Sequence, residues 1–248
     1  MNTTGNTILI TGGTSGIGLA FAEEFLKRKN KVIVCGRRED RLAALKAKHA
    51  ELETIKCDIS ISSERDFLAK TILEKFPNIN IIINNAGVQL AMDLNNEVSL
   101  KRIMSEVDTN FIAPIHLSSL FVKHLSQNEN AAIINISSGL AFVPIAFMPV
   151  YCATKAAIHS YTISLRHQLK NTSIKVFEIA PPSVDTELGH DRRSDPTQSH
   201  GGLPVNEFLT EAMQALENDL LEAPIAQSKF LREKGMEMFE TINGRFEN

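Results

Sequence analysis

The chain of 248 residues has no tryptophan, two tyrosines and three cysteines. The cysteines, Cys35, Cys57 and Cys152, are an odd number without metal-ligand spacing, so we expect reduced thiols rather than a disulfide framework or a zinc site. No apolar run approaches the roughly 20 residues of a membrane-spanning helix, and the N-terminal stretch lacks a basic leader followed by an apolar region. These absences predict a cytoplasmic protein.

Neither sign of charge predominates, since 26 Lys and Arg residues face 29 Asp and Glu residues for a formal net charge of −3. This balance argues against nucleic acid or a membrane surface as the main partner. The length suits one large domain or two small ones. Because no linker and no internal repeat interrupts the chain, we predict a single domain over 1–248.

Short, β-branched apolar runs alternate with longer amphipathic segments. The runs lack clean polar alternation, which is typical of strands covered on both faces of a parallel sheet. Strands are expected at 7–11, 31–35, 54–57, 80–84, 131–137 and 174–180, and helices at 16–29, 38–50, 62–76, 99–127, 151–170 and 205–218. This order predicts a doubly wound (Rossmann-like) α/β fold, a mostly parallel sheet flanked by helices with right-handed crossovers. Towards the C-terminus, "APIA" (223–226) suggests a short seventh strand and 228–242 a helix interrupted by Gly235.

A glycine-rich turn, "TGGTSGIG" (11–18), follows the first strand and opens the first helix. Gly12 permits the tight turn, Gly16 lets backbone N–H groups approach a pyrophosphate, and Gly18 lets the helix pack closely. The helix N-terminus adds unpaired donors and partial positive charge. No lysine follows the last glycine, which excludes a P-loop. The turn therefore predicts a dinucleotide site, and the alternative is a plain glycine turn.

The second strand ends in "CGRRED", where folds that prefer NAD carry an acidic residue for the adenosine ribose. Gly36 occupies that place and Arg37 follows it. A guanidinium can bind a 2′-phosphate bidentately, and the hydroxyls of Thr14 and Ser15 could add donors. Arg38 is expected to begin a solvated helix. The pattern predicts NADP as the cofactor, with NAD as the alternative.

Six motifs in order make the chain resemble the short-chain dehydrogenase/reductase family from Thr7 to about Glu187. They are "TGGTSGIG", "CDIS", "NNAG", "VDTNF", "INISSG" and "YCATK". The turn matches the compact single-domain branch, TGxxxGxG. A finer resemblance, carried by "SGLAF", "LRHQL" and "APPSVDTEL", is to the branch that includes the oxidoreductase encoded with teichoic-acid D-alanylation genes. The family usually has glycine where this chain has Pro182, and proline fixes φ there.

The resemblance implies a catalytic tetrad of Asn110, Ser138, Tyr151 and Lys155. It places Asp58 against the adenine and Thr186 against the nicotinamide carboxamide. The cofactor contacts expected on this basis and from the glycine turn are Gly12, Thr14, Ser15, Gly16, Ile17, Gly18, Arg37, Asp58, Ile59, Asn85, Ala86, Gly87, Tyr151, Lys155, Val184 and Thr186.

A tyrosine with its usual pKa of about 10 is a poor general acid/base at neutral pH, but a nearby ammonium lowers that pKa. The i, i+4 spacing puts Tyr151 and Lys155 on one helix face, and Pro149 suits the entry to that helix. Ser138 would hold the substrate oxygen. By resemblance, Lys155 also binds the nicotinamide ribose and Asn110 holds a water.

These residues predict an NADP(H)-dependent oxidoreductase that interconverts a carbonyl and an alcohol of a small molecule, with Tyr151 as general acid/base. The alternatives are an NAD-dependent alcohol dehydrogenase and a catalytically idle nucleotide-sensing protein. No metal is predicted, because no His, Cys or carboxylate cluster has ligand spacing. His159 and His167 on the Tyr151 helix are assigned no functional role.

The substrate side is less well defined by sequence. The apolar segment 139–149 fits either a pocket wall or ordinary core or subunit packing. The polar segment 187–204 is predicted to form a substrate loop or lid. Ser137 is a weaker candidate than Ser138 for the catalytic serine, because its hydroxyl is more simply explained as a polar group at the end of a strand. By resemblance, helices 99–127 and 151–170 pack against a second subunit, which predicts a homodimer or homotetramer.

Overall fold

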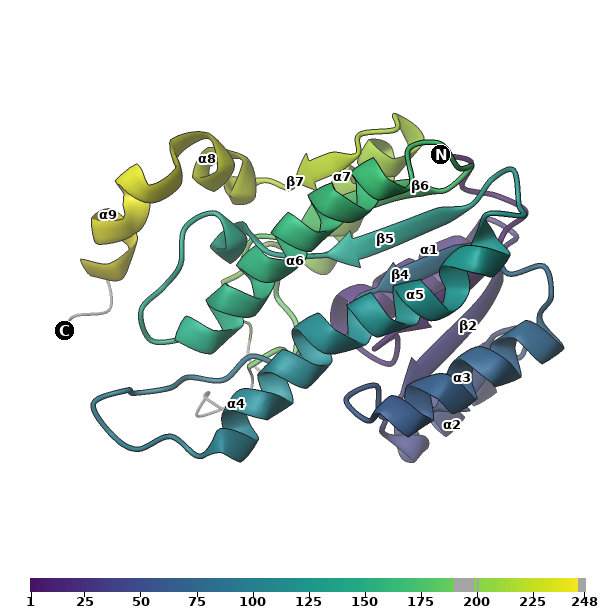
Figure 1. Ribbon diagram of the computed structural model, residues 1–248, viewed down its shortest axis with the longest axis horizontal. Helices are drawn as coiled ribbons and strands as arrows, with labels where there is room; N and C mark the ends of the chain where they lie inside the picture. Colours follow the sequence, from purple (N-terminus) through teal and green to yellow (C-terminus); the bar gives the residue numbers. More distant parts are fainter. Residues whose placement is uncertain (190–198, 200, 245–248) are drawn as a thin grey trace.

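The computed structural model describes residues 1–189, 199 and 201–244 (Figure 1). Its centre is a seven-stranded sheet of order β3-β2-β1-β4-β5-β6-β7, in which every neighbouring pair is parallel. The strands are β1 Thr7–Thr11, β2 Lys31–Gly36, β3 Glu53–Lys56, β4 Ile81–Asn84, β5 Ala132–Ile136, β6 Lys175–Ala180 and β7 Glu222–Pro224. The predicted doubly wound fold and the short seventh strand are confirmed.

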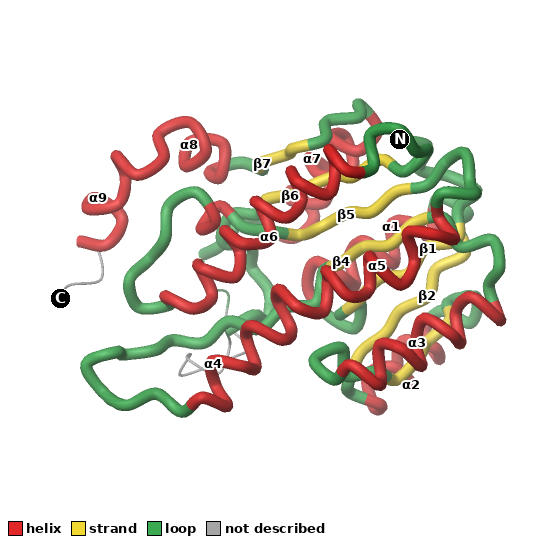
Figure 2. Tube along the Cα trace, viewed as in Figure 1, coloured by secondary structure: helices red, strands yellow, loops and turns green. Residues whose placement is uncertain are grey.

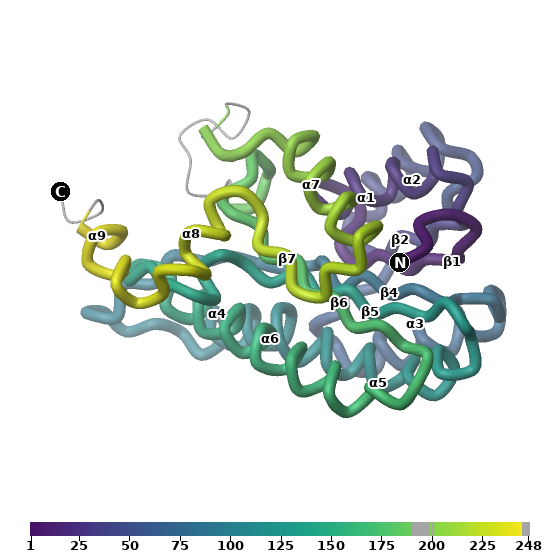
Figure 3. Tube along the Cα trace, turned by 90° about the horizontal axis from the view of Figure 1, so that it is seen from above, coloured from purple at the N-terminus to yellow at the C-terminus, as the bar shows by residue number. Residues whose placement is uncertain are grey.

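Helices cover both faces of the sheet (Figure 3). One layer contains α1 Gly16–Lys27, α2 Glu39–Lys48 and α7 Val205–Glu217. The opposite layer contains α3 Ser62–Lys75, α4 Leu100–Val107, α5 Ala113–Leu125 and α6 Pro149–Gln168. All residues of β4 and β5 are buried, which is why their sequences are apolar without alternation.

The two layers give the molecule two apolar cores. Successive residues of β1 alternate between them, because side chains along a strand point to opposite faces. Ile8 and Ile10 pack with Phe21 of α1, whereas Leu9 packs with Phe121 of α5. Strand order reverses between β1 and β4, so their carboxyl ends open a crevice where ligands of such sheets bind.

The segment predicted as one helix at 99–127 is broken in the structure. A π-helical turn, η1 Asp108–Ile112, separates α4 from α5, and the N–H of Ala113 bonds to Asp108 O. Pro114 explains the break, because it lacks the N–H that an α-helix would direct to the carbonyl of Asn110. Turns of this kind are frequent at functional sites.

The C-terminal part runs from β7 into α8 Gln227–Lys234, a 3₁₀ turn Gly235–Met238 and α9 Phe239–Asn243 (Figure 2). Gly235 ends α8 with φ +57°, so the predicted interruption is confirmed. Asn243 fastens α9 to the 139–149 segment, since its Oδ1 accepts from Ala146 N at 2.6 Å and its Nδ2 donates to Pro144 O at 3.1 Å.

All three cysteines are free and buried, as expected for reduced thiols. Burial raises the pKa of Cys57 to about 12 and also raises that of Cys152. These thiols therefore stay protonated at neutral pH. Within the part of the chain that the structure describes, no helix combines the length and apolar character needed to cross a membrane.

Candidate active site

The floor of the candidate site is the glycine-rich turn at the end of β1. Gly12 has φ +65°, and a Cβ on it would lie 2.8 Å from Cα of Ala86. A Cβ on Gly18 would lie 2.5 Å from Gly12 O, so α1 can approach the turn only with glycine there. The backbone of the turn is thereby left accessible for close approach of a ligand.

The N-terminus of α1 faces the crevice with its first-turn N–H groups. Ser15 precedes the helix with an extended backbone, and no acidic residue lies in the first turn. Such an end is a ready anion site. Thr186, the predicted nicotinamide contact, lies over the same turn: its Cβ is 3.1 Å from where a Cβ on Gly16 would be.

The loop after β4 joins the turn to the predicted tetrad. The Thr11 hydroxyl accepts from Asn85 N at 3.0 Å and from Ala86 N at 3.1 Å. A Cβ on Gly87 would lie 3.4 Å from Asn110 Oδ1 and 3.8 Å from Lys155 Nζ. The "NNAG" motif is therefore in contact with both ends of the crevice.

Asn110 lies buried in the π turn and is held by three hydrogen bonds. Its Oδ1 accepts from Val88 N at 2.8 Å, and its Nδ2 donates to Val88 O at 2.8 Å and to Thr154 Oγ1 at 3.2 Å. The side chain thus ties the β4 loop to α6, while the water expected beside it stays a prediction.

Tyr151 and Lys155 lie one turn apart on α6, and each is only 5% exposed. The helix begins at Pro149, as predicted. Lys155 Nζ donates to Ile136 O at 2.9 Å and lies 5.6 Å from the centroid of the Tyr151 ring. Burial lowers the pKa of Lys155 to about 8, and the negative charge of Glu178 partly offsets this.

Ser138 follows β5 and caps a short 3₁₀ turn that packs against α6, the helix of Tyr151. Its hydroxyl accepts from Leu140 N at 3.1 Å. The rival Ser137 directs its hydroxyl to Ile179 O of β6 at 3.4 Å. The geometry therefore favours Ser138 over Ser137 for contact with a substrate.

Two arginines lie near the turn at the predicted adenosine end. Arg37 Nη1 is 3.8 Å from Asp58 Oδ2. Arg38 Nη2 donates to Ser15 Oγ at 3.0 Å and reaches Thr14 Oγ1 at 3.5 Å. The expectation that Arg38 only begins a solvated helix was incomplete, since it also joins α2 to the glycine-rich turn.

Glu187 is the residue of this region that sequence reasoning missed. Both of its carboxylate oxygens accept from Arg41 Nη1, at 2.7 and 2.6 Å, and Arg38 Nη1 lies 3.4 Å away. Partial burial favours a higher pKa for Glu187, but the bonds from Arg41 and the charge of Arg38 outweigh it, and its pKa is lowered. The residues are 146 positions apart, so no local motif could have paired them.

Two other predicted contacts are buried. Ile59 is buried in the core, and Val184 is buried and forms a bridge to Leu203. Of the predicted lid 187–204, residues 190–198 and 200 lie outside the described residues. The 139–149 segment packs in a small apolar cluster made of Ile145, Met148, Tyr151 and Cys152, with Leu140, Phe147 and Ile242 against it.

Comparisons with known proteins identify the family to which the chain belongs. Residues 6–197 match the model of the short chain dehydrogenase family. The chain is 43% identical over 230 residues to the uncharacterized oxidoreductase DltE of Bacillus subtilis, covering 90% of this chain and 91% of that protein. The predicted family resemblance, including the finer one, is confirmed.

Solved structures similar to the chain include examples with either nicotinamide dinucleotide. A short-chain dehydrogenase from Sphingobium yanoikuyae in complex with NADPH is 27% identical, with TM-score 0.81 over 88% of this chain and 87% of that one. A short chain dehydrogenase/reductase from Burkholderia phymatum in complex with NAD is 26% identical, with TM-score 0.83 over 94% and 93%.

Proposed function

The chain belongs to the short-chain dehydrogenase/reductase family, and we propose that it is an NADP(H)-dependent oxidoreductase that interconverts a carbonyl and an alcohol of a small molecule. One observation carries the proposal: Tyr151 and Lys155 lie buried, one turn apart, and Lys155 lies beside Gly87 of the loop that packs on the glycine-rich turn. The turn leaves room and backbone donors for a dinucleotide, which supplies the hydride when bound.

The proton is the chain's own contribution to the reaction. In reduction, Tyr151 donates its phenolic proton to the substrate oxygen while Ser138 donates a hydrogen bond that holds that oxygen in place. The Lys155 ammonium stabilises the resulting phenolate, because an opposite charge nearby favours the ionised form. Asn110 joins the β4 loop to α6 by hydrogen bonds and so holds the proposed nucleotide site at a fixed position relative to Tyr151.

NADP is proposed rather than NAD because positive charge gathers at the adenosine end. Arg37 stays the proposed bidentate partner of a 2′-phosphate, and Arg38, already bonded to Ser15, is a second. The Glu187 carboxylate, which accepts from Arg41 and lies 3.4 Å from Arg38 Nη1, would compete with the phosphate for Arg38. Asp58 and Ile59 are proposed at the adenine, and Val184 and Thr186 at the nicotinamide, by resemblance to the family.

Two measurements test the proposal. The first compares dissociation constants of NADPH and NADH, where we expect NADPH to bind at least about tenfold tighter; tighter NADH binding would refute the arginine argument. The second follows NADPH absorbance across a panel of aldehydes and ketones, where at least one should be turned over. Nucleotide binding without any turnover would instead support the nucleotide-sensing alternative.

A further inference from the structure

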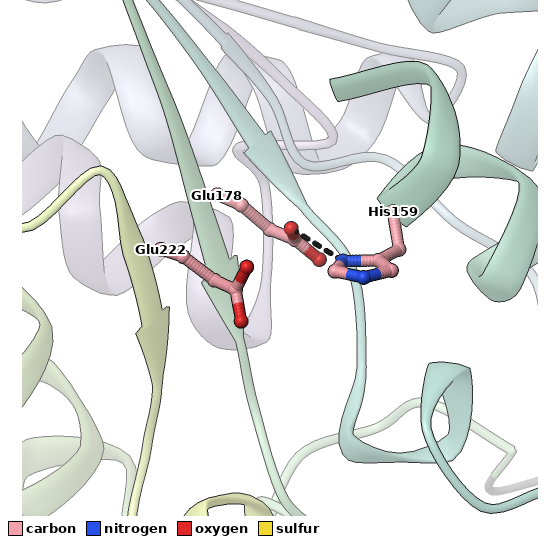
Figure 4. A group of neighbouring side chains, drawn as sticks. All are labelled: His159, Glu178 and Glu222. Carbon is pink, nitrogen blue, oxygen red and sulfur yellow. Dashed lines mark hydrogen bonds and ion pairs between the residues drawn. The ribbon is translucent and has the colours of Figure 1, made fainter. Parts of the chain in front are cut away.

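Behind the proposed active site, three ionisable side chains from different elements meet: His159 of α6, Glu178 of β6 and Glu222 of β7 (Figure 4). One ligand-type atom of each lies within 4.8 Å of the others. Glu178 and Glu222 are register partners on adjacent parallel strands, so their side chains share the face of the sheet that α6 covers. Two like charges placed directly opposite each other on adjacent strands are destabilising.

Glu178 has the greatest need of polar partners in this group, because its carboxylate is fully buried. Its Oε2 lies 2.8 Å from His159 Nδ1, while its Oε1 is buried and has no hydrogen-bond partner among the described residues. Figure 4 shows the Glu178 carboxylate directed towards His159, with that of Glu222 beside it. A buried carboxylate oxygen without a partner is costly, so this atom points to a ligand.

The neighbouring side chains hold the cluster in shape. Arg232 Nε lies 2.5 Å from Glu222 Oε1, and its guanidinium carbon lies 5.3 Å from the centroid of the Phe142 ring. That ring meets the His159 imidazole edge-on at 5.2 Å. Arg232 and Phe142 therefore fix the orientation of Glu222 and His159, in the way that neighbouring side chains commonly orient metal ligands.

We propose that His159, Glu178 and Glu222 form a divalent metal site, with Zn²⁺ as the best-matched ion. One imidazole nitrogen and two carboxylates suit Zn²⁺, whereas Mg²⁺ prefers oxygen ligands alone. The ligands would be His159 Nδ1 and one oxygen of each carboxylate, with a water in the fourth position. The ion supplies the positive charge that Glu178 Oε1 lacks, and it joins α6 to the edge strand β7.

Thiols do not compete for the ion, because all three cysteines are buried and the pKa of each is raised. The site is also distinct from the tetrad, since His159 lies two helical turns beyond Tyr151. Sequence reasoning did not predict it, because the three ligands come from positions 159, 178 and 222 without any local spacing.

The test uses the full chain, stripped with EDTA and titrated with Zn²⁺ by calorimetry at pH 7.5. We expect one equivalent to bind and a higher unfolding temperature with the ion. His159→Gln and Glu222→Gln, both at part-exposed positions, should each weaken binding at least about tenfold. His167→Gln, exposed on the same helix, is the matched control and should leave it unchanged.

Either of two results would overturn the proposal. One is the absence of stoichiometric Zn²⁺ binding to the wild-type chain, which would leave His159 and Glu178 as an ion pair alone. The other is equal affinity in the wild type and in both ligand variants, which would place any bound zinc elsewhere. Circular dichroism of the variants checks that they keep the fold.

Discussion

Lys155 is a buried cation whose presence needs a reason beyond packing. Its amine donates to Ile136 O, and burial lowers its pKa to about 8 from an ordinary value of 10.5. At neutral pH the ammonium form still predominates, 5.6 Å from the ring centroid of Tyr151. A charge kept in such a place costs stability and favours the phenolate, which is how proton-transfer sites are commonly arranged.

We predict that Lys155→Met abolishes turnover yet stabilises the fold at pH 7, by at most roughly 3 kcal/mol for a pKa lowered from 10.5 to about 8. The sign follows from proton binding. Below pH 8 the folded and unfolded chains both carry the proton, and the folded chain bears the full cost. Between pH 8 and 10.5 only the unfolded chain binds it, so wild-type stability rises with pH relative to the variant.

Urea unfolding at pH 7 and pH 9.5 measures this difference. The gap between Lys155→Met and wild type should shrink at the higher pH, while the exposed control Lys170→Met should match wild type at both. A gap that does not change with pH would contradict the assignment of Lys155 as a charged group at pH 7.

Glu187 makes a second prediction at the residue scale. Its carboxylate accepts from Arg41 and lies beside Arg38, where the 2′-phosphate is proposed to bind. Glu187→Gln should therefore tighten NADPH binding about threefold, a modest effect because these charges are partly exposed. NADH binding should stay within about twofold, and the exposed control Glu207→Gln should change neither. An NADPH affinity that is unchanged in Glu187→Gln would mean that the Glu187 carboxylate does not affect the site of the 2′-phosphate.

At the scale of elements, most of the sheet was predictable because the central strands β1, β2, β4, β5 and β6 are largely buried. All seven predicted strands occur within a residue or two of their observed bounds. The central strands are apolar β-branched runs that have few other places to lie, whereas β3 and β7 are partly exposed edge strands. The π turn within 99–127 was not predicted. Its cause is the missing N–H of Pro114, which could equally have marked a kink or a helix end.

Part of the candidate site was likewise predictable from the sequence, and part was not. The glycine-rich turn and the Tyr151–Lys155 pair are local motifs, so spacing alone brings their groups together. The pairing of Arg41 with Glu187 and the His159–Glu178–Glu222 cluster depend on strand order and on which helix covers which face. Such contacts follow from the topology of the sheet and not from any stretch of sequence.

The close packing of α1 on the glycine-rich turn gives a prediction at this scale. Gly18→Ala places a Cβ 2.5 Å from Gly12 O and against Asn85, so the turn must shift. We expect nucleotide affinity to fall at least about tenfold, with a lower unfolding temperature. Gly244→Ala is the control, because nothing lies within 4 Å of its added Cβ. Wild-type affinity in Gly18→Ala, measured by fluorescence titration with NADPH, would contradict the role of the turn.

The whole molecule presents apolar side chains on the outer helices α4 and α6. Leu100 is 69% exposed, and Met104 and Ile163 are also exposed. In the short-chain dehydrogenase/reductase family, the helices at these positions commonly pack against a second subunit. We therefore predict a homodimer or homotetramer.

Light scattering coupled to gel filtration tests the assembly. The wild type should elute with two or four times the mass of one chain, and Ile163→Glu should shift it towards the monomer. Phe67→Glu, at a 65% exposed position on α3, should leave the assembly intact. A monomeric wild type would contradict the prediction.

The central claim is that Tyr151 delivers the proton, and it is tested most directly by Tyr151→Phe. The measurement is the turnover of NADPH with a carbonyl substrate identified in the panel, together with the dissociation constant of NADPH. We predict a loss of at least about 100-fold in kcat, the usual contribution of a positioned general acid, with a much smaller change in the NADPH dissociation constant, because Tyr151 is only one of many expected cofactor contacts. Turnover by Tyr151→Phe near the wild-type rate would contradict it.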